Sequence, residues 1–262
     1  MMMMMKKKKE RKKCIGILKC PGSFDYGVMF SSILEKHQFA TKIFDCEAGE
    51  LPSRHEDFDG FIITGSSASA YDDVDWVKGL ISKTRELIEK KCRVVGICFG
   101  HQVVAQAFCP GEVTKNPNGW ELGMCSFTLE DHAAKYLSNV TSMNDDEPKL
   151  LMKSLSLLCV HADCVRSVPK GFRSIGGNAN TSIQGMLSLD RNVLTFQSHP
   201  EFNRQVVREC ALSIVKKYGP ITTFSMDVFN SRISDHLDST FVRAAIVGHF
   251  MREEEGLNYD WS

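Results

Sequence analysis

A cysteine flanked by glycines directly after a short apolar run is the feature that most restricts how this chain can fold. Residues 94–102 read Val-Val-Gly-Ile-Cys-Phe-Gly-His-Gln, which places Gly96, Cys98, Gly100 and Gln102 in G-x-C-x-G-x-Q spacing. A strand that enters a helix through so tight a turn raises the central residue into the open, as the G-x-S-x-G turn does for serine. At a helix N-terminus, backbone amides and the helix dipole favour the thiolate form. The spacing predicts a strand–turn–helix unit with a reactive thiol; a buried structural cysteine is the alternative.

Apolar strand-like runs alternate with helical patterns in the first half of the chain. This alternation predicts an α/β fold with a mostly parallel open sheet and helices on both faces. The expected strands are residues 14–20, 42–44, 58–64 and 93–97, and the expected helices are residues 27–37, 74–90 and 101–108.

Short strands separated by Gly, Asn and Asp turns follow, which predicts a small mixed or antiparallel portion before the final helices. The expected strands are 112–115, 123–129, 157–161, 172–176, 182–189 and 193–197, with helices at 204–217 and 239–253 and a polar loop at 143–148. We expect a disordered basic arm (1–13), one catalytic domain (14–218) and a helical C-terminal extension (219–262) that packs on the same domain.

Composition limits the classes of partner. The 32 basic and 32 acidic residues cancel, which gives no indication of nucleic-acid binding. No segment reaches the roughly 18 uninterrupted apolar residues of a membrane span, and the basic start lacks the apolar region of a secretory signal. The ten cysteines contain no C-x-x-C pair, and no His/Cys/Asp set has metal-ligand spacing. We therefore expect a cytoplasmic protein with reduced thiols, no metal, no cofactor and no membrane contact.

A second chemically useful segment follows the apolar strand at 193–197. A thiol nucleophile needs a base, and an imidazole base needs an acceptor that holds its tautomer. His199 and Glu201 are two residues apart, so their side chains point the same way in extended backbone, which Pro200 favours. A solvated His–Glu pair at a strand end is the alternative, and the cysteine turn elsewhere in the chain favours the catalytic interpretation.

A third segment, residues 64–69, is a glycine turn after another buried strand. Backbone amides near Gly65 and Ser66, together with the amide of Phe99 after the cysteine, could form an oxyanion hole. An ordinary strand-to-loop exit is the alternative. His161 also ends an apolar strand and could face the same pocket, whereas His101 at most lines its mouth.

Together these segments resemble the class I glutamine amidotransferase family. The G-x-C-x-G-x-Q turn matches at 96–102 and the terminal H-P-E at 199–201, the glycine-rich oxyanion strand matches loosely at 64–69, and residues 160–172 are similar to the family's S-H-x-D segment. The resemblance implies a flavodoxin-like fold and attack by Cys98 on a γ-glutamyl carbonyl, with His199 as proton shuttle and Glu201 as its orienter. It implies oxyanion donors near Ser66 and at Phe99, and a substrate-binding role for Gln102.

Within that family the motif spelling is most similar to the stand-alone γ-glutamyl peptidase branch. Asp59–Ser66, Gly96–Gln102 and His199–Asn203 carry this similarity, although many synthase-linked members read Gly-Gly-Pro where this chain reads Gly65-Ser66-Ser67. The resemblance implies a small γ-glutamyl substrate and a cysteine hydrolase acting on glutathione-type conjugates. Two alternatives stay open: a glutaminase that supplies ammonia to a partner synthase subunit, and a non-catalytic module that binds glutamine or a γ-glutamyl metabolite.

Overall fold

The central sheet has the mostly parallel order that the sequence predicts. The computed structural model describes residues 11–141, 151–219 and 238–252, and within them seven strands form one sheet in the order β2-β1-β3-β4-β12-β11-β9. The first five strands in this order run parallel, and β11 and β9 add to the edge in antiparallel pairing. The bounds are β1 Cys14–Lys19, β2 Ala40–Asp45, β3 Gly60–Ile63, β4 Val94–Ile97, β9 Phe172–Ser174, β11 Gly185–Ser188 and β12 Val193–Phe196.

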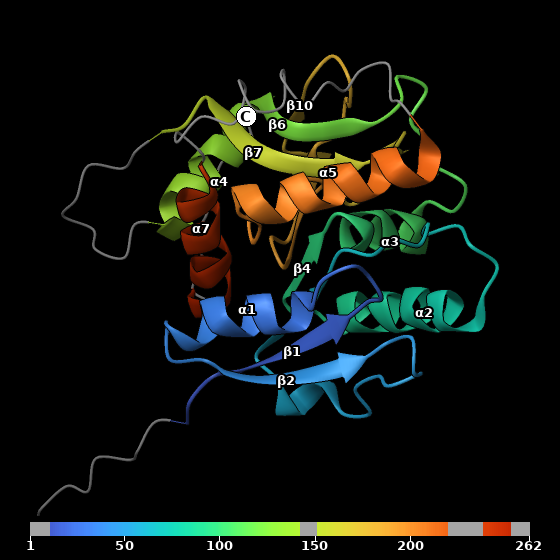
Figure 1. Cartoon of the computed structure of the whole chain (residues 1–262). Coiled ribbons are helices and arrows are strands. Elements are labelled where there is room, and N and C mark those ends of the chain that lie inside the picture. The colour runs from blue at the N-terminus through green and yellow to red at the C-terminus, as the bar shows by residue number, and fades with distance from the viewer. Residues whose placement is uncertain (1–10, 142–150, 220–237, 253–262) are drawn as a thin grey trace, which may run out of the picture.

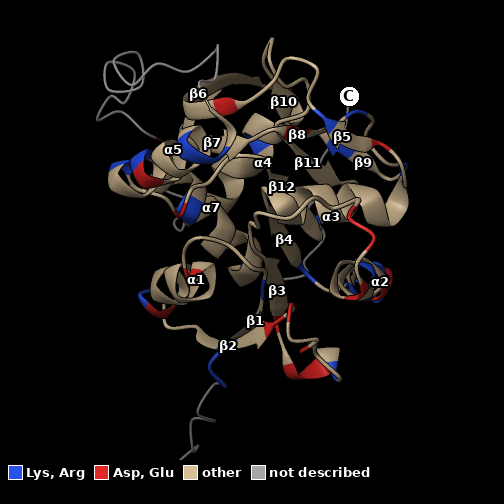
Figure 2. Ribbon diagram, turned by 45° about the vertical axis from the view of Figure 1, so that its right-hand side comes forward, with Lys and Arg blue, Asp and Glu red and all other residues tan. Residues whose placement is uncertain are grey.

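Helices cover both faces of this sheet (Figure 1), which explains why its inner strands are continuously apolar. Every residue of β3, β4 and β12 is buried. One core lies between the sheet and α1, α4 and α7, and another lies between the sheet and α2 and α3. Figure 2 shows the charged residues on the surrounding helices and loops. The helix bounds are α1 Tyr26–Glu35, α2 Asp75–Glu89, α3 Phe99–Phe108, α4 Asp131–Thr141, α5 Arg204–Tyr218 and α7 Ser239–Met251, with a 3-10 turn η1 at His55–Asp57.

Antiparallel strands form a second layer beside the sheet. The strands β6 (Glu121–Leu129) and β7 (Ser154–His161) pair along their length, and β10 (Gly176–Gly177) adds to β6. The pair β5 (Val113–Lys115) and β8 (Asp163–Val165) lies apart from them in the sheet order. The predicted antiparallel portion is therefore present, and it holds His161 and Asp163 close to the central sheet.

Two details of the sequence prediction were wrong. The strand expected at 172–176 is split, because Gly176 has φ 138° and lets the chain leave the central sheet at β9 and join β6 as β10. Helix α4 was not predicted at all, although Ala133, Ala134 and Leu137 form an apolar stripe that is buried.

Several predicted features lie wholly or partly outside the described residues. These are most of the arm 1–13, the loop 143–148, and much of the extension 219–262. Arg11 does lie within the structure and pairs with Asp59 at 3.0 Å. Helix α7 packs in the same core as α1 and α4, and the ring of Phe250 lies against Gly60, where a Cβ would approach it to 2.6 Å.

All ten cysteines lie within the described residues and are free thiols, seven of them buried. None of the helices in the described ranges combines the length and the apolar character that crossing a membrane requires.

Candidate active site

Cys98 occupies a strained turn between β4 and α3. Its backbone has φ 51° and ψ −102°, in the left-handed region that costs a side-chain-bearing residue about 1–3 kcal/mol. The flanking glycines allow the turn: a Cβ on Gly100 would lie 2.2 Å from the carbonyl oxygen of Ile63, and one on Gly96 would lie 2.7 Å from that of Gly100. The predicted strand–turn–helix unit is present, and its helix begins at Phe99, two residues earlier than expected.

The thiol of Cys98 is reached only through a pocket, since the residue is 5% exposed rather than raised into open solvent. Its sulfur donates to the carbonyl of Val160 at 3.9 Å and accepts from Nε2 of Gln197 at 3.6 Å. These contacts come from β7 and from the end of β12, so the thiol sits where three separate segments converge.

His199 and Glu201 form the expected pair beside this thiol. Nδ1 of His199 lies 2.7 Å from Oε1 of Glu201, and both side chains are nearly inaccessible to solvent. The imidazole stacks flat on the ring of Phe202, with 4.0 Å between centroids and 5° between planes. Because Nδ1 is used by Glu201, Nε2 is the nitrogen available to Cys98.

The charges around His199 favour its cationic form. Burial alone would lower the pKa of this imidazole, but the charges of Glu201 and Cys98 and its hydrogen bonds to them raise that pKa to about 10. At neutral pH the imidazole therefore carries a proton that it can donate to a leaving group.

The predicted oxyanion strand lies against the same histidine. A Cβ on Gly65 would lie 2.7 Å from Cε1 of His199, so this backbone passes directly beside the imidazole. The hydroxyl of Ser66 donates to the carbonyl of Pro21 at 2.7 Å, which fixes the loop. Within the described chain no hydrogen bond engages the backbone amide of Ser66 or that of Phe99. Both are available to an oxyanion next to Cys98.

Gln102 lies in the pocket, but its amide also holds the pocket together. Its Nε2 donates to Oε1 of Gln197 at 3.1 Å and to the carbonyl of Asp163 at 3.3 Å. The carboxylate of Asp163 accepts from Ser69 and Tyr71 and pairs with Lys115 at 2.8 Å. The wall formed by Gln102 and Asp163 is therefore rigid before any substrate arrives.

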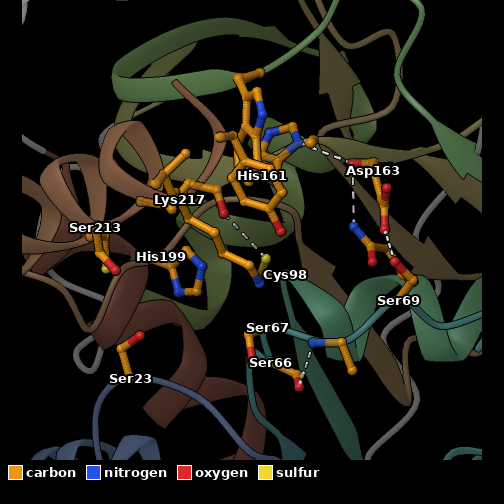
Figure 3. Close-up of a pocket in the computed structure, with 18 of the residues that line it drawn as sticks. Ser23, Ser66, Ser67, Ser69, Cys98, His161, Asp163, His199, Ser213 and Lys217 are labelled. Atoms are coloured by element: carbon orange, nitrogen blue, oxygen red, sulfur yellow. Dashed lines mark hydrogen bonds between the residues drawn. The ribbon is translucent and has the colours of Figure 1, made fainter. Parts of the chain in front are cut away.

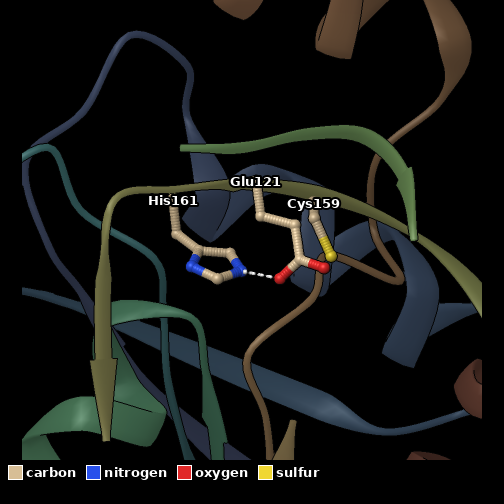
Figure 4. Close-up of side chains that lie close together, drawn as sticks. All are labelled: Glu121, Cys159 and His161. Carbon is tan, nitrogen blue, oxygen red and sulfur yellow. Dashed lines mark ion pairs between the residues drawn. The ribbon is translucent and has the colours of Figure 1, made fainter. Parts of the chain in front are cut away.

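His161 also lines the pocket, as the sequence suggested, and it is held by a buried ion pair (Figure 4). Its Nε2 lies 3.0 Å from Oε2 of Glu121, and its Nδ1 donates to the carbonyl of Asp163 at 3.0 Å. Burial would lower the pKa of His161, but hydrogen bonds with Cys159 and Glu121 raise it well above its ordinary value. Burial would raise the pKa of the Glu121 carboxyl, but the hydrogen bond to His161 and the charge of that imidazole lower it to about 2.

Glu121, Cys159 and His161 also bring three potential metal ligands together, a grouping that the sequence spacing did not indicate. Their ligand atoms all lie within 4.8 Å of one another. The carboxylate of Glu121, however, already accepts hydrogen bonds from three polar side chains in addition to the imidazolium: Asn178, Thr181 and Gln184. These hydrogen bonds and the imidazolium satisfy the carboxylate of Glu121. The cluster is therefore explained as a buried ion pair, without a metal ion.

His101 does not line the pocket mouth. It belongs to α3, is fully buried, and its Nδ1 bonds Oγ1 of Thr195 on β12 at 2.8 Å. Burial lowers the pKa of His101 to about 3, which keeps the ring neutral. At this position of α3 the side chain points toward the central sheet rather than toward Cys98.

Among the residues near the site to which the sequence reasoning gave no role are Gln197, Glu121 and Arg243. Gln197 directly follows β12 and stands two residues before His199. This position at the carboxyl end of a parallel strand could have indicated that its side chain lies near the site. Glu121 reaches His161 because β6 pairs with β7. Arg243 lies on α7, and its side chain donates to the carbonyl of Pro200 at 2.7 Å. Both contacts join residues that are far apart in the sequence, so no local sequence pattern predicts them.

The pocket around Cys98 has a volume of about 500 Å³, within the range of sites that hold drug-sized ligands. Figure 3 shows Asp163 and Ser69 on one side of Cys98 and His199 and Ser213 on the other. The pocket therefore extends in two directions from the sulfur.

Comparison with known proteins gives consistent results. Residues 25–209 match the family described as glutamine amidotransferase class-I. A glutamine amidotransferase-like protein of Schizosaccharomyces pombe is 29% identical over 238 residues, 85% of this chain and 89% of that protein. Gamma-glutamyl peptidase 2 of Arabidopsis thaliana is 31% identical over 164 residues, 62% of this chain and 61% of that protein.

A solved glutamine amidotransferase from Thermotoga maritima has the same fold, with a TM-score of 0.72 over 93% of this chain and all of that one, at 16% identity. A GMP synthase from Bordetella parapertussis is 29% identical over 154 residues, 59% of this chain but 27% of that protein.

Proposed function

Because this chain belongs to the class I glutamine amidotransferase family, we propose that it hydrolyses a γ-glutamyl amide bond through a thioester on Cys98. The observation that carries the proposal is that Cys98 and His199 line one pocket, with Glu201 bound to the imidazole and two unengaged amides nearby. Nucleophile, base and orienter in this order support acyl transfer.

In the proposed reaction the thiolate of Cys98 attacks the γ-carbonyl carbon, and the amides of Ser66 and Phe99 stabilise the resulting oxyanion. His199 donates its Nε2 proton to the leaving amine as the C–N bond breaks, which leaves a γ-glutamyl thioester on the enzyme. Water then gives a proton to His199 and attacks the thioester. Glutamate departs, and the thiolate and imidazolium are restored. Glu201 holds the ring through both steps.

The pocket favours a peptide over glutamine as the substrate. A volume of about 500 Å³ exceeds the needs of a single amino acid, and part of the pocket wall lies on the His199 side of Cys98. That side receives the leaving group. The similarity to γ-glutamyl peptidases supports the same choice. A γ-glutamyl peptidase acting on glutathione-type conjugates is therefore our preferred proposal.

A glutaminase that supplies ammonia to a synthase subunit is the second candidate. The observation that favours it is the similarity to GMP synthase, of which this chain matches only about a quarter. Such a role would require a partner that accepts the ammonia.

The test is release of glutamate from glutamine and from a glutathione conjugate by the purified chain. We expect turnover of the conjugate, a much slower reaction with glutamine, and a loss of about 10⁴-fold or more in the Cys98→Ala variant. Cys109→Ala is a matched control, because this free cysteine does not line the pocket. Activity that survives Cys98→Ala would contradict the proposal, and turnover of glutamine alone would favour the second candidate.

A further inference from the structure

One wall of the pocket is formed by α5, the helix that follows His199. The residues of α5 that line the pocket are spaced at helical intervals and share one face: Cys210, Ser213, Ile214, Lys217 and Tyr218. Figure 3 shows Ser213 and Lys217 on this wall, with Lys217 extending toward Cys98. The face therefore runs from the reacting atoms to the mouth of the pocket.

The chemistry of the proposed reaction decides which half of a substrate meets this wall. His199 must touch the leaving amine to give it a proton, so the amine half extends from the His199 side of Cys98. Gln102 and Asp163 lie on the opposite side and remain for the glutamyl half. The α5 wall is thus the surface along which the leaving group lies.

Lys217 is the cation on this wall without an acidic partner. Lys115, the other lysine of the pocket, is neutralised by Asp163 at 2.8 Å. Lys217 makes no ion pair with any residue in the described ranges, and its ammonium lies 5.0 Å from the ring centroid of Tyr218. That ring in turn packs at 5.7 Å on Trp120. The pocket mouth therefore offers one uncompensated positive charge beside an aromatic surface.

The length of the wall fits a short peptide. Cys210 lines the pocket together with Cys98 and is buried, whereas Lys217 is exposed. Lys217 follows seven residues later, about 10 Å along the helix axis. Two extended residues span up to about 7 Å, and a lysine side chain covers the remainder.

We propose that Lys217 binds the free terminal carboxylate of the leaving group, so that the preferred substrates are γ-glutamyl peptides whose amine half ends in a carboxylate. Trp120 and Tyr218 provide an apolar surface for a side chain or S-substituent of the same half. This inference rests on the proposed function, and it makes γ-glutamyl peptides with an amidated C-terminus the poorer substrates.

The experiment compares S-benzylglutathione with its C-terminal carboxamide. The two have nearly the same shape, but the carboxamide lacks the negative charge of the glycine carboxylate. We expect the free acid to have a kcat/KM about fivefold higher, the range of a partly exposed ion pair. Lys217→Met removes this preference and Lys217→Arg keeps it. Lys216→Met, which removes the neighbouring charge outside the pocket, leaves it unchanged. Equal rates for acid and amide in the wild type, or a preference that survives Lys217→Met, would overturn the inference while leaving the hydrolase proposal intact.

Binding separates this inference from the reaction itself. Cys98→Ala cannot form the thioester, so calorimetry on this variant measures affinity for the intact peptide. We expect the acid to bind about fivefold more tightly than the amide, and Lys217→Met in the same background to abolish the difference. If the wild type releases no glutamate from either peptide, the hydrolase proposal fails. The acid-to-amide ratio in the Cys98→Ala protein then decides the role of Lys217, and an equal affinity rejects it.

Discussion

At the scale of single residues, the orientation of one imidazole controls the site. Glu201 holds Nδ1 of His199 and Phe202 supports the face of its ring. The sequence indicated the Glu201 contact because residues two apart share a side in extended backbone. It could not indicate the stacking, which depends on how the chain turns after Pro200.

Glu201→Gln removes the negative charge that raises the pKa of His199. We expect the alkaline limb of the kcat/KM profile to move about one to two pH units lower, because the imidazolium that protonates the leaving amine is lost as pH rises through a lower pKa. The value of kcat should fall about 10²- to 10⁴-fold. Rates measured across the alkaline range, with the exposed Glu209→Gln as control, test this. An unchanged alkaline limb would show that another group limits the reaction.

At the scale of elements, the site joins a local unit to a long-range one. The turn from β4 to α3 was predictable, because the glycines at fixed spacing around Cys98 are the residues that so tight a turn requires. The antiparallel pair of β6 and β7 was only partly predictable. Its strands were expected, but the pairing of Glu121 with His161 depends on a register between residues that are 40 positions apart in the sequence. No periodicity in either strand specifies that register.

Glu121→Gln tests the buried ion pair between β6 and β7. The raised pKa of His161 contributes stability that is complete below its ordinary value of 6.5 and fades as pH rises toward the raised value. The lowered pKa of Glu121 contributes stability that is complete above 4.5 and is lost as pH falls toward about 2. We therefore expect Glu121→Gln to reduce the free energy of unfolding by about 3–5 kcal/mol near pH 5.5, and by less near pH 8. Urea unfolding at both pH values measures this, and an equal loss at both would argue that His161 is neutral in the folded protein.

At the scale of the whole molecule, the sheet separates two cores and supports the site at its edge. Helix α7 completes one core through Phe250 and also contacts the site loop through Arg243, which donates to Pro200. A C-terminal helix was expected from the sequence. The position of α7 could not be predicted. Its apolar residues lie almost all round the helix, which indicates burial but does not indicate which elements it packs against.

Phe250→Ala tests whether α7 is part of one cooperative unit. The ring is fully buried against Phe39 and Gly60, so we expect a loss of about 3–5 kcal/mol in the free energy of unfolding. Far-ultraviolet circular dichroism and tryptophan fluorescence should report the same urea midpoint, lower than in the wild type. Met251→Ala, at a position that is 40% exposed, is the control and should change little. A separate early transition seen by circular dichroism alone would mean that α7 unfolds independently.

The flat stacking of His199 on Phe202 sets the order of events in the proposed hydrolysis. A ring fixed by Glu201 and Phe202 cannot turn to present its other nitrogen, so Nε2 must give a proton to the amine and later take one from water. Amine and water then use the same position in succession. The first product has to leave before the second step can begin, and the packing of one aromatic ring makes product release an obligatory, ordered event.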